Sequence, residues 1–274
     1  MPNDRKAGVA DSHSRLRVTG AWAPFGAALA AFHDRGEDLP VKVRNDFGPP
    51  EEIHVAIFFR EEDAFEDWET IALGQCGRRV LDVGACVGAH ALVLQERGHE
   101  VTALDPIPCA VRIMRERGVE DAREESLFEL SPANVYDTVI LLMNGSMIAE
   151  TLAGLDRLLA AAATVLEPQG TPILDSTDLR DAADDDEGLE SEDDDPYIGE
   201  LHYQLSVGEQ VGDVFPQLFV DPDTLDRRVR LAGWDMEVIW SGPGGRYLAR
   251  LLRSAASVID DTAGQDGAFS ETLA

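Results

Sequence analysis

Residues 79–90 read RVLDVGACVGAH, and this stretch decides the fold. An apolar strand pattern ends in an acid, enters a turn of small residues and leaves as an amphipathic helix. Residues 101–105 then read VTALD, a short strand with a second acid, Asp105, at its tip. A strand, a small-residue loop, a helix and such a second strand form half of a nucleotide site, in which the acid accepts hydrogen bonds from both ribose hydroxyls.

The spacing of the glycines narrows the choice of nucleotide. A dinucleotide fingerprint reads Gly-x-Gly-x-x-Gly, whereas the matching positions here are Gly84, Cys86 and Ala89. The loop instead reads Asp-x-Gly-x-x-x-Gly, through Asp82, Gly84 and Gly88. A carboxylate at Asp82 repels a pyrophosphate but suits a cationic amino-acid ligand. An ordinary strand-to-helix turn is the alternative for the glycine loop alone, but it leaves the acid at the next strand tip unexplained.

This pattern resembles motif I of the class I S-adenosylmethionine (SAM) methyltransferases, Asp/Glu-x-Gly-x-Gly-x-Gly. The resemblance covers about residues 69–253. It implies an α/β fold of the Rossmann-like kind: a doubly wound, seven-stranded, mostly parallel sheet with an antiparallel last strand. SAM would lie across the carboxyl ends of the first strands. Cys86 departs from the motif, because it stands at the usual middle glycine, where a side chain narrows the cofactor pocket.

The resemblance also implies roles for the motif residues. Asp82 would orient the amino group of SAM, and Asp105 would hold its ribose. The loop residues line the methionine part of the cofactor; they are Gly84, Ala85, Cys86 and Gly88. Ser126, flanked by Glu125, stands where the family usually has an acid that reaches the adenine amino group. Either residue is a candidate for that bond, and a plain strand end is the alternative.

A narrower resemblance points to a group of bacterial class I methyltransferases of unassigned substrate. It is carried by residues 136–145 and 175–178, which read YDTVILLMNG and DSTD, and by a Phe-Arg pair at Phe59-Arg60. Arg60 is a candidate partner for the SAM carboxylate, because a guanidinium matches carboxylate geometry; a surface salt bridge is the alternative. Asn144 follows the fourth strand, at the edge that faces the transferring methyl group, so it is a candidate to contact cofactor or substrate.

Three further side chains are weaker candidates for chemistry. His90 opens the helix after the glycine loop, where a charged imidazole is disfavoured beside a helix N-terminus; we expect a neutral, structural hydrogen-bonding group. His202 and Tyr203 lie on a predicted hairpin that is placed to meet a substrate. Because side chains alternate along a strand, only one of these two can point inward.

The remaining pattern predicts one main domain with short additions. Residues 1–20 read as a polar, poorly ordered leader, 21–68 as an N-terminal helical cap segment and 254–274 as a disordered tail. Within the domain, strands and helices alternate as in a parallel, doubly wound sheet. The expected strands are 79–83, 100–104, 122–127, 136–143, 171–175, 237–240 and 246–252, the expected helices are 89–97, 108–117 and 152–165, and an inserted β-hairpin spans 200–220.

Charge excludes several partners. The 274-residue chain has a formal net charge of −29 and only two lysines, Lys6 and Lys42. Such a surface repels nucleic acid and anionic membranes unless salt screens it, and it indicates adaptation to a high-salt cytoplasm, as in a halophile. Ten of the fifteen residues in 181–195 are acidic. Without EF-hand spacing, this run predicts a solvated loop and no metal.

Cysteine usage and hydropathy indicate the cytoplasm. Cys76, Cys86 and Cys109 show no metal-ligand spacing, and an odd number without a secretory signal indicates reduced thiols, with packing as the expected role of the last two. The N-terminus is polar, and no apolar run is long enough to cross a bilayer.

These observations predict a SAM-dependent methyltransferase that acts on a small molecule. The Asn-Pro-Pro-Tyr-type tetrapeptide associated with amino methylation of bases or glutamine is missing after the fourth strand. Two alternatives stay open: a SAM-binding protein without turnover, and an NAD(P)-dependent oxidoreductase, which the glycine spacing disfavours. Methyl transfer needs alignment more than acid–base chemistry. The sequence therefore names neither the acceptor nor a catalytic base, and it leaves the oligomeric state open.

Overall fold

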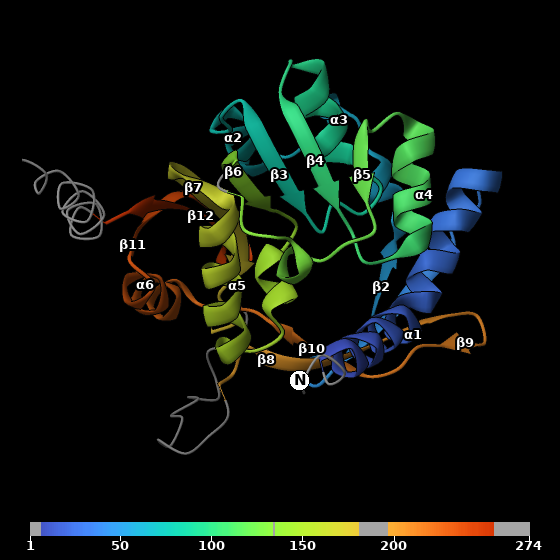
Figure 1. Cartoon of the computed structure of the whole chain (residues 1–274). Coiled ribbons are helices and arrows are strands. Elements are labelled where there is room, and N and C mark those ends of the chain that lie inside the picture. Colours follow the sequence, from blue (N-terminus) through green and yellow to red (C-terminus); the bar gives the residue numbers. More distant parts are fainter. Residues whose placement is uncertain (1–6, 134, 181–196, 255–274) are drawn as a thin grey trace, which may run out of the picture.

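A seven-stranded sheet forms the centre of the computed structural model, which describes residues 7–133, 135–180 and 197–254 (Figure 1). Its strand order is β11-β12-β7-β6-β3-β4-β5. Strands β5, β4, β3, β6 and β7 are parallel, and β12 is antiparallel to both β7 and β11. This confirms the predicted Rossmann-like sheet. The strands are β3 Arg79–Val83, β4 Glu100–Leu104, β5 Asp121–Arg123, β6 Tyr136–Leu141, β7 Leu166–Thr177, β11 Trp234–Ser241 and β12 Arg246–Arg253.

Helices cover both faces of this sheet, so its strands are buried on two sides. Val80 and Ile140 face the cluster built with α2, α3 and α4, whereas Leu81 and Val139 face the cluster built with α5 and α6. This double burial explains the continuous apolar run of β6. The helices are α2 Asp67–Gly74, α3 Ala89–Glu96, α4 Pro108–Arg117, α5 Leu152–Val165 and α6 Pro222–Leu231.

Local signals in the sequence account for the helix ends. Thr151 caps α5, its hydroxyl accepting from the Gly154 N–H at 3.0 Å. Asp221 caps α6, its carboxylate accepting from the Thr224 N–H at 2.9 Å, and Pro222 occupies the first helical position. Such side chains satisfy amide groups that the first turn of a helix leaves without partners.

A second, antiparallel sheet corrects the expectation for the N-terminal segment. Its order is β10-β8-β1-β2, with β9 paired to β8. The predicted hairpin is therefore part of a larger sheet, and the segment expected to be helical supplies two strands. Helix α1 runs Ala7–Arg35, so it begins inside the predicted leader. The strands are β1 Pro40–Asn45, β2 Glu51–His54, β8 Glu200–Val207, β9 Gln210–Val211 and β10 Phe215–Leu218.

We call α1 and the smaller sheet the cap. Figure 1 shows the cap beside the carboxyl ends of β3 and β4, below the larger sheet in that view. One hydrophobic cluster joins its parts: Phe25 of α1, Val43 of β1 and Leu205 of β8 pack with Val87 of the glycine loop and Ile113 of α4. The cap thus stands over the edge where Rossmann-like sheets bind their ligands.

Several element boundaries differ from the prediction, three of them by enough to need a reason. Strand β5 ends at Arg123, and a 3-10 helix at Leu127–Glu129 follows. Strand β6 ends at Leu141, two residues early. Strand β7 begins at Leu166 rather than 171, because its pairing with β6 shifts register and so tolerates Pro168 and Gly170.

Some expectations concern parts of the chain that the structure does not describe. The acidic run at 181–195 lies outside the described residues, as do residues 1–6 of the predicted leader and 255–274 of the predicted tail. Within the described ranges, none of the helices has the length and apolar character needed to cross a bilayer.

Candidate functional site

The loop between β3 and α3, which we call the cradle, has glycine at positions 84 and 88 and so carries no side chain at either. Gly84 and Gly88 have φ of 76° and 80°, and a Cβ there would meet neighbouring side-chain atoms at 2.9 and 2.7 Å. Both conformation and space therefore require glycine. The N–H groups of Gly84 and Ala85 donate to the Leu104 carbonyl at 2.9 Å each. Cys86 also has a left-handed φ of 51°, and its side chain packs against the hydrophobic cluster of the cap.

Two buried acids flank this cradle. Asp82 is 2% exposed, and its Oδ2 has no hydrogen-bond partner among the described residues. Asp105 is 4% exposed; its two oxygens accept from the N–H groups of Cys86 at 2.9 Å and Ile107 at 2.8 Å. Each carboxylate oxygen of Asp105 keeps capacity for a second hydrogen bond. The loop thus orients one acid and leaves the other unpaired.

The two acids predict how ligand affinity depends on pH. Burial raises the pKa of Asp82 to about 6 and that of Asp105 to about 7. An ammonium group that binds at Asp82 favours the charged carboxylate, so affinity should be constant above about pH 7 and fall up to about tenfold per unit as the pH drops through 6. Calorimetry with S-adenosylhomocysteine, which carries that ammonium group, measures this. An affinity that does not change between about pH 5 and 8 would contradict the placement.

The raised pKa values of Asp82 and Asp105 also make the stability of the ligand-free protein depend on pH, in the direction opposite to ligand affinity. Both folded-state pKa values lie above the ordinary value of 3.8 for an aspartate. The folded chain therefore binds these protons before the unfolded chain does. Asp82 and Asp105 lower stability at neutral pH, and this loss is relieved as the pH falls from about 7 towards 4. Buried acids whose raised pKa values lower the stability in this way are typical of ligand-binding sites.

Arg60 and His90 meet at one buried carboxylate, Glu69, which is fully shielded from solvent. Glu69 Oε1 lies 2.9 Å from Arg60 Nη2 and 2.8 Å from His90 Nε2. Arg60 also donates to the carbonyls of Ile57 at 2.7 Å and Ala64 at 3.1 Å. The ion pair is largely buried, unlike the surface salt bridge expected as the alternative, and a contact of Arg60 with the SAM carboxylate stays a prediction. His90 has the expected structural place.

A second buried carboxylate, Asp175, holds the loop after β6. Asp175 accepts from the N–H groups of Asn144 at 2.8 Å and Gly145 at 3.2 Å, and from Arg246 Nη2 at 2.7 Å. Asn144 and the residue before it have left-handed φ angles of 60° and 66°, a strained pair for non-glycine residues. The Asn144 side chain accepts from the Thr177 hydroxyl at 2.8 Å. This predicted site residue is thus rigidly placed at the carboxyl edge of the sheet.

Ser126, which was predicted to contact adenine, makes hydrogen bonds with residues two and three positions further along the chain. The Ser126 hydroxyl accepts from the Phe128 N–H at 3.3 Å, and the Ser126 N–H donates to Glu129 at 3.0 Å. These bonds form a capping box for the short helix that begins at Leu127. The plain strand-end alternative is therefore closer to the structure, and a contact from Ser126 to adenine stays a prediction.

His202 and Tyr203 lie on opposite faces of β8, as the alternation required. The His202 side chain is exposed, and its Nδ1 lies 3.1 Å from Asp46. Tyr203 points inward and stacks near Phe219 at 6.0 Å between ring centroids. Burial raises the pKa of Tyr203 to about 12, so its hydroxyl stays neutral. Only Tyr203 remains a candidate to meet a substrate.

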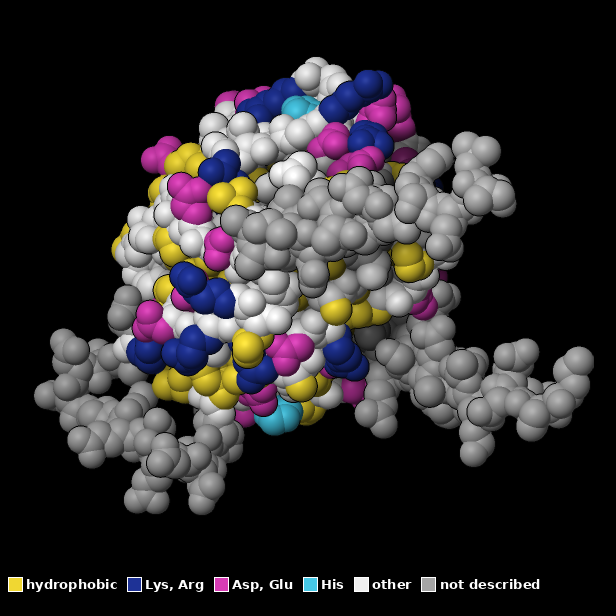
Figure 2. All heavy atoms as spheres, turned by 60° about the vertical axis from the view of Figure 1, so that its left-hand side comes forward, with side chains coloured by type: hydrophobic (Ala, Val, Ile, Leu, Met, Phe, Trp, Pro, Cys, Tyr) yellow, Lys and Arg dark blue, Asp and Glu magenta, His cyan; other side chains and the backbone are white. Residues whose placement is uncertain are grey.

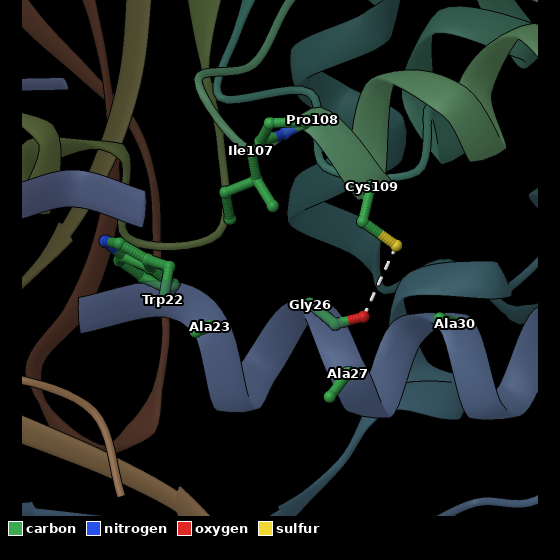
Figure 3. A pocket seen from close by; sticks show the side chains of 8 residues that line it. All are labelled: Trp22, Ala23, Gly26, Ala27, Ala30, Ile107, Pro108 and Cys109. Atoms are coloured by element: carbon green, nitrogen blue, oxygen red, sulfur yellow. Dashed lines mark hydrogen bonds between the residues drawn. The ribbon is translucent and has the colours of Figure 1, made fainter. Parts of the chain in front are cut away.

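An apolar groove lies where the cap meets the loop after Asp105 (Figure 3). Its volume is about 400 Å³. The Cys109 thiol donates to the Gly26 carbonyl across it, at 3.3 Å. The lining residues are Trp22, Ala23, Gly26, Ala27, Ala30, Ile107, Pro108 and Cys109. Helix α1 thus rests on the start of α4 through small side chains, close to the acid expected to hold ribose.

The cradle and the unpaired acid test whether SAM fits. Packing against Ile148 and Val119 requires glycine at 84 and 88 and so fixes the loop, and the orphaned Asp82 oxygen beside it suits the ammonium group of an amino-acid chain. Asp105 at the tip of β4 suits a ribose. The sheet order and these groups define a Rossmann-like protein for a nucleoside with a cationic amino-acid end.

Known proteins agree with this class. A family described as a methyltransferase domain matches residues 81–174. A SAM-dependent methyltransferase from Bacteroides fragilis, solved in complex with S-adenosyl-L-homocysteine, is 34% identical, covers 86% of this chain and 96% of its own, and has a TM-score of 0.75. The chain therefore belongs to the SAM-dependent methyltransferases, with SAM as methyl donor. This membership decides against the oxidoreductase.

More distant structures share the fold. The CcbJ methyltransferase from Streptomyces caelestis is 17% identical, covers 71% of this chain and 99% of its own, and has a TM-score of 0.56. A SAM-dependent methyltransferase from Clostridium acetobutylicum is 10% identical, covers 73% and 98% of the two chains, and has a TM-score of 0.52. No curated protein sequence matches the chain.

The sequence reading missed the residues that support the two loops. Glu69, Asp175 and Arg246 are buried or half-buried charges whose partners come from distant strands and helices. For Asp175 a signal was present, because it stands at the carboxyl end of a parallel strand, as Asp105 does. Glu69 carried no comparable signal, since only the fold brings His90 to it.

Proposed function

We propose that the chain transfers the methyl group of SAM to a small-molecule acceptor in the cytoplasm. The observation that carries this proposal is the cap, which stands over the carboxyl edge of the larger sheet (Figure 1). The cradle that suits SAM and the Asn144 loop both end at this edge. A covered edge supports an acceptor small enough to be enclosed rather than a polymer.

The cap is fastened at both ends of this edge. On the cofactor side, the cluster of Phe25, Leu205 and Val87 joins α1 and β8 to the glycine loop. On the other side, the Ser146 hydroxyl donates to the Leu218 carbonyl of β10 at 2.9 Å and lies 2.8 Å from the Ser176 hydroxyl. A polymer would have to displace these buried contacts to reach the edge.

Surface charge supports the same class of acceptor. With 52 acidic and 23 basic side chains, the chain repels polyanions. On the face in Figure 2, Lys and Arg side chains lie beside Asp and Glu and form no continuous basic patch. Nucleic acid and anionic membranes are therefore disfavoured as partners. The same excess of carboxylates supports a protein adapted to high salt.

The residues of this chain would act by alignment. SAM supplies a methyl group already activated on a sulfonium. Asp82 would hold its amino group and Asp105 its ribose, while the glycine loop lets the backbone approach. Asn144, fixed by Asp175 and Thr177, and Tyr203 of the cap would face the acceptor. Held in this way, donor and acceptor need little further help, because proximity and orientation supply most of the rate.

A panel of metabolites tests the proposal. With SAM labelled on its methyl group, we expect the label in at least one small molecule, and we expect Asn144→Ala to reduce that transfer about five- to thirtyfold, since a lost polar contact costs of order 1–2 kcal/mol. Protein and RNA fractions of an extract serve as competing acceptors. Labelling confined to these polymers would overturn the small-molecule acceptor but leave the cofactor assignment intact.

A further inference from the structure

Glu69 is a buried charge that neither the glycine loop nor the acceptor side uses directly. Its side chain is fully shielded from solvent. Burial by itself raises the pKa of Glu69, yet the bond with His90, the Glu66 N–H and the charge of Arg60 hold that pKa below its ordinary value. A charge kept in such a place is costly for stability alone, because apolar packing would serve as well.

The two oxygens of Glu69 have separate tasks. Oε2 accepts from the Glu66 N–H at 2.9 Å and closes the capping box of α2. Oε1 lies 2.8 Å from His90 Nε2 and 2.9 Å from Arg60 Nη2. The cap of α2 needs only Oε2. The second oxygen therefore ties α2 to a different element, the first turn of α3.

His90 stands where it can set the cofactor loop. It is the second residue of α3, two positions after the left-handed Gly88 that precedes the helix. It is 8% exposed, and the Phe65 ring packs edge-on against it at 5.1 Å. Burial raises the pKa of Asp82, and His90 is the neighbouring group that acts against this rise. His90 thus joins the pinned carboxylate of Glu69 to the first turn of α3, next to the glycine loop.

We propose that Glu69 is a positioning residue for SAM binding, which acts through His90 to fix the first turn of α3 and the glycine loop before it. This inference rests on the cofactor placement proposed above. Groups that orient a binding residue from behind often govern affinity without touching the ligand. Glu69 does so from outside the motif that contacts SAM.

Glu69→Gln and Glu66→Gln form a matched pair of test variants. Both remove a carboxylate from the same capping box, but only Glu69→Gln removes the charged acceptor of His90 and Arg60. By calorimetry with S-adenosylhomocysteine, at a temperature where circular dichroism shows both variants folded, we expect Glu69→Gln to bind about tenfold more weakly. Glu66→Gln should stay within about twofold of the original protein. Equal affinities for the two variants would overturn the proposal.

The variant His90→Leu tests whether Glu69 acts on the glycine loop through His90. This change leaves Glu69 paired with Arg60 and the Glu66 N–H, so it also carries the test if Glu69→Gln does not fold. We expect it to weaken binding about tenfold, and the double variant with Glu69→Gln to bind no more weakly than His90→Leu alone. Independent, multiplying losses or an unchanged His90→Leu affinity would overturn the route. An unchanged affinity in Asp105→Ala would instead show that the cofactor placement itself is wrong.

Discussion

Replacing Asp105 by alanine is expected to weaken binding of S-adenosylhomocysteine at least about a hundredfold. The two carboxylate oxygens are already oriented by backbone N–H groups, and each can accept one ribose hydroxyl. Hydrogen bonds to a charged group contribute roughly 1.5–3 kcal/mol apiece, so two of them account for a factor of about a hundred or more. Calorimetry on the folded variant measures the loss.

Asp121→Ala is the matched control for Asp105→Ala. Asp121 begins the neighbouring strand β5, where it accepts from Thr102 at 2.9 Å and pairs with Arg123 at 2.6 Å. It lies at the amino end of its strand, away from the cradle. We expect its removal to leave the affinity within about twofold. Similar losses in both variants would mean that Asp105 acts through general stability and not through the ribose.

Arg246→Met is expected to lower the free energy of unfolding by about 3–5 kcal/mol, because it leaves a buried charge without its partner. The partner, Asp175, is fully shielded from solvent, and Arg246 also stacks on the Trp68 ring at 4.0 Å. Methionine keeps much of the side-chain volume, so lost pairing rather than a cavity dominates. Chemical denaturation at constant high salt measures the change.

Arg79→Met controls for the loss of an arginine at the opposite edge of the same sheet. Arg79 pairs with Asp137 at 3.1 Å and Glu167 at 2.9 Å, but all three side chains are about one-third exposed. Solvent screens such pairs, so we expect a loss much smaller than that of Arg246→Met. A double variant, Arg246→Met with Asp175→Asn, should recover part of the stability. Equal losses in the two single variants would contradict a special role for the Asp175 pair.

Motifs made of neighbouring residues were predictable from the sequence. The glycine loop, the acid at the tip of β4 and the alternation of strands and helices each depend on a few consecutive positions. Strand β6 could be placed from its run of apolar residues, and helix α4 from the proline at its start and the glycine after its end. These local rules sufficed for the larger sheet and for the places of Asp82, Gly84, Gly88 and Asp105 at its carboxyl edge, whose contacts with SAM stay predictions.

Contacts between distant segments were not predictable in this way. Strand β1 alternates buried Val41 and Val43 with outward-facing Lys42 and Arg44, a pattern of a half-buried strand, but its partner β8 lies far along the chain. The pairing of Arg60 and His90 at Glu69 has the same origin. An arginine near an acidic stretch reads as a surface residue until the fold shows which carboxylate is buried.

The cap has a consequence for the order in which a new chain matures on the ribosome. Strand β1 is synthesised early, yet its neighbour β8 is synthesised only after β3 to β7. Because pairings between remote segments form late, the cap is completed only after the glycine loop and strands β3 to β7 have been made. Until β8 arrives, Val41 and Val43 have no finished sheet to join. A nascent chain thus contains the glycine loop and Asp105 before the strand that completes the cap beside them is synthesised.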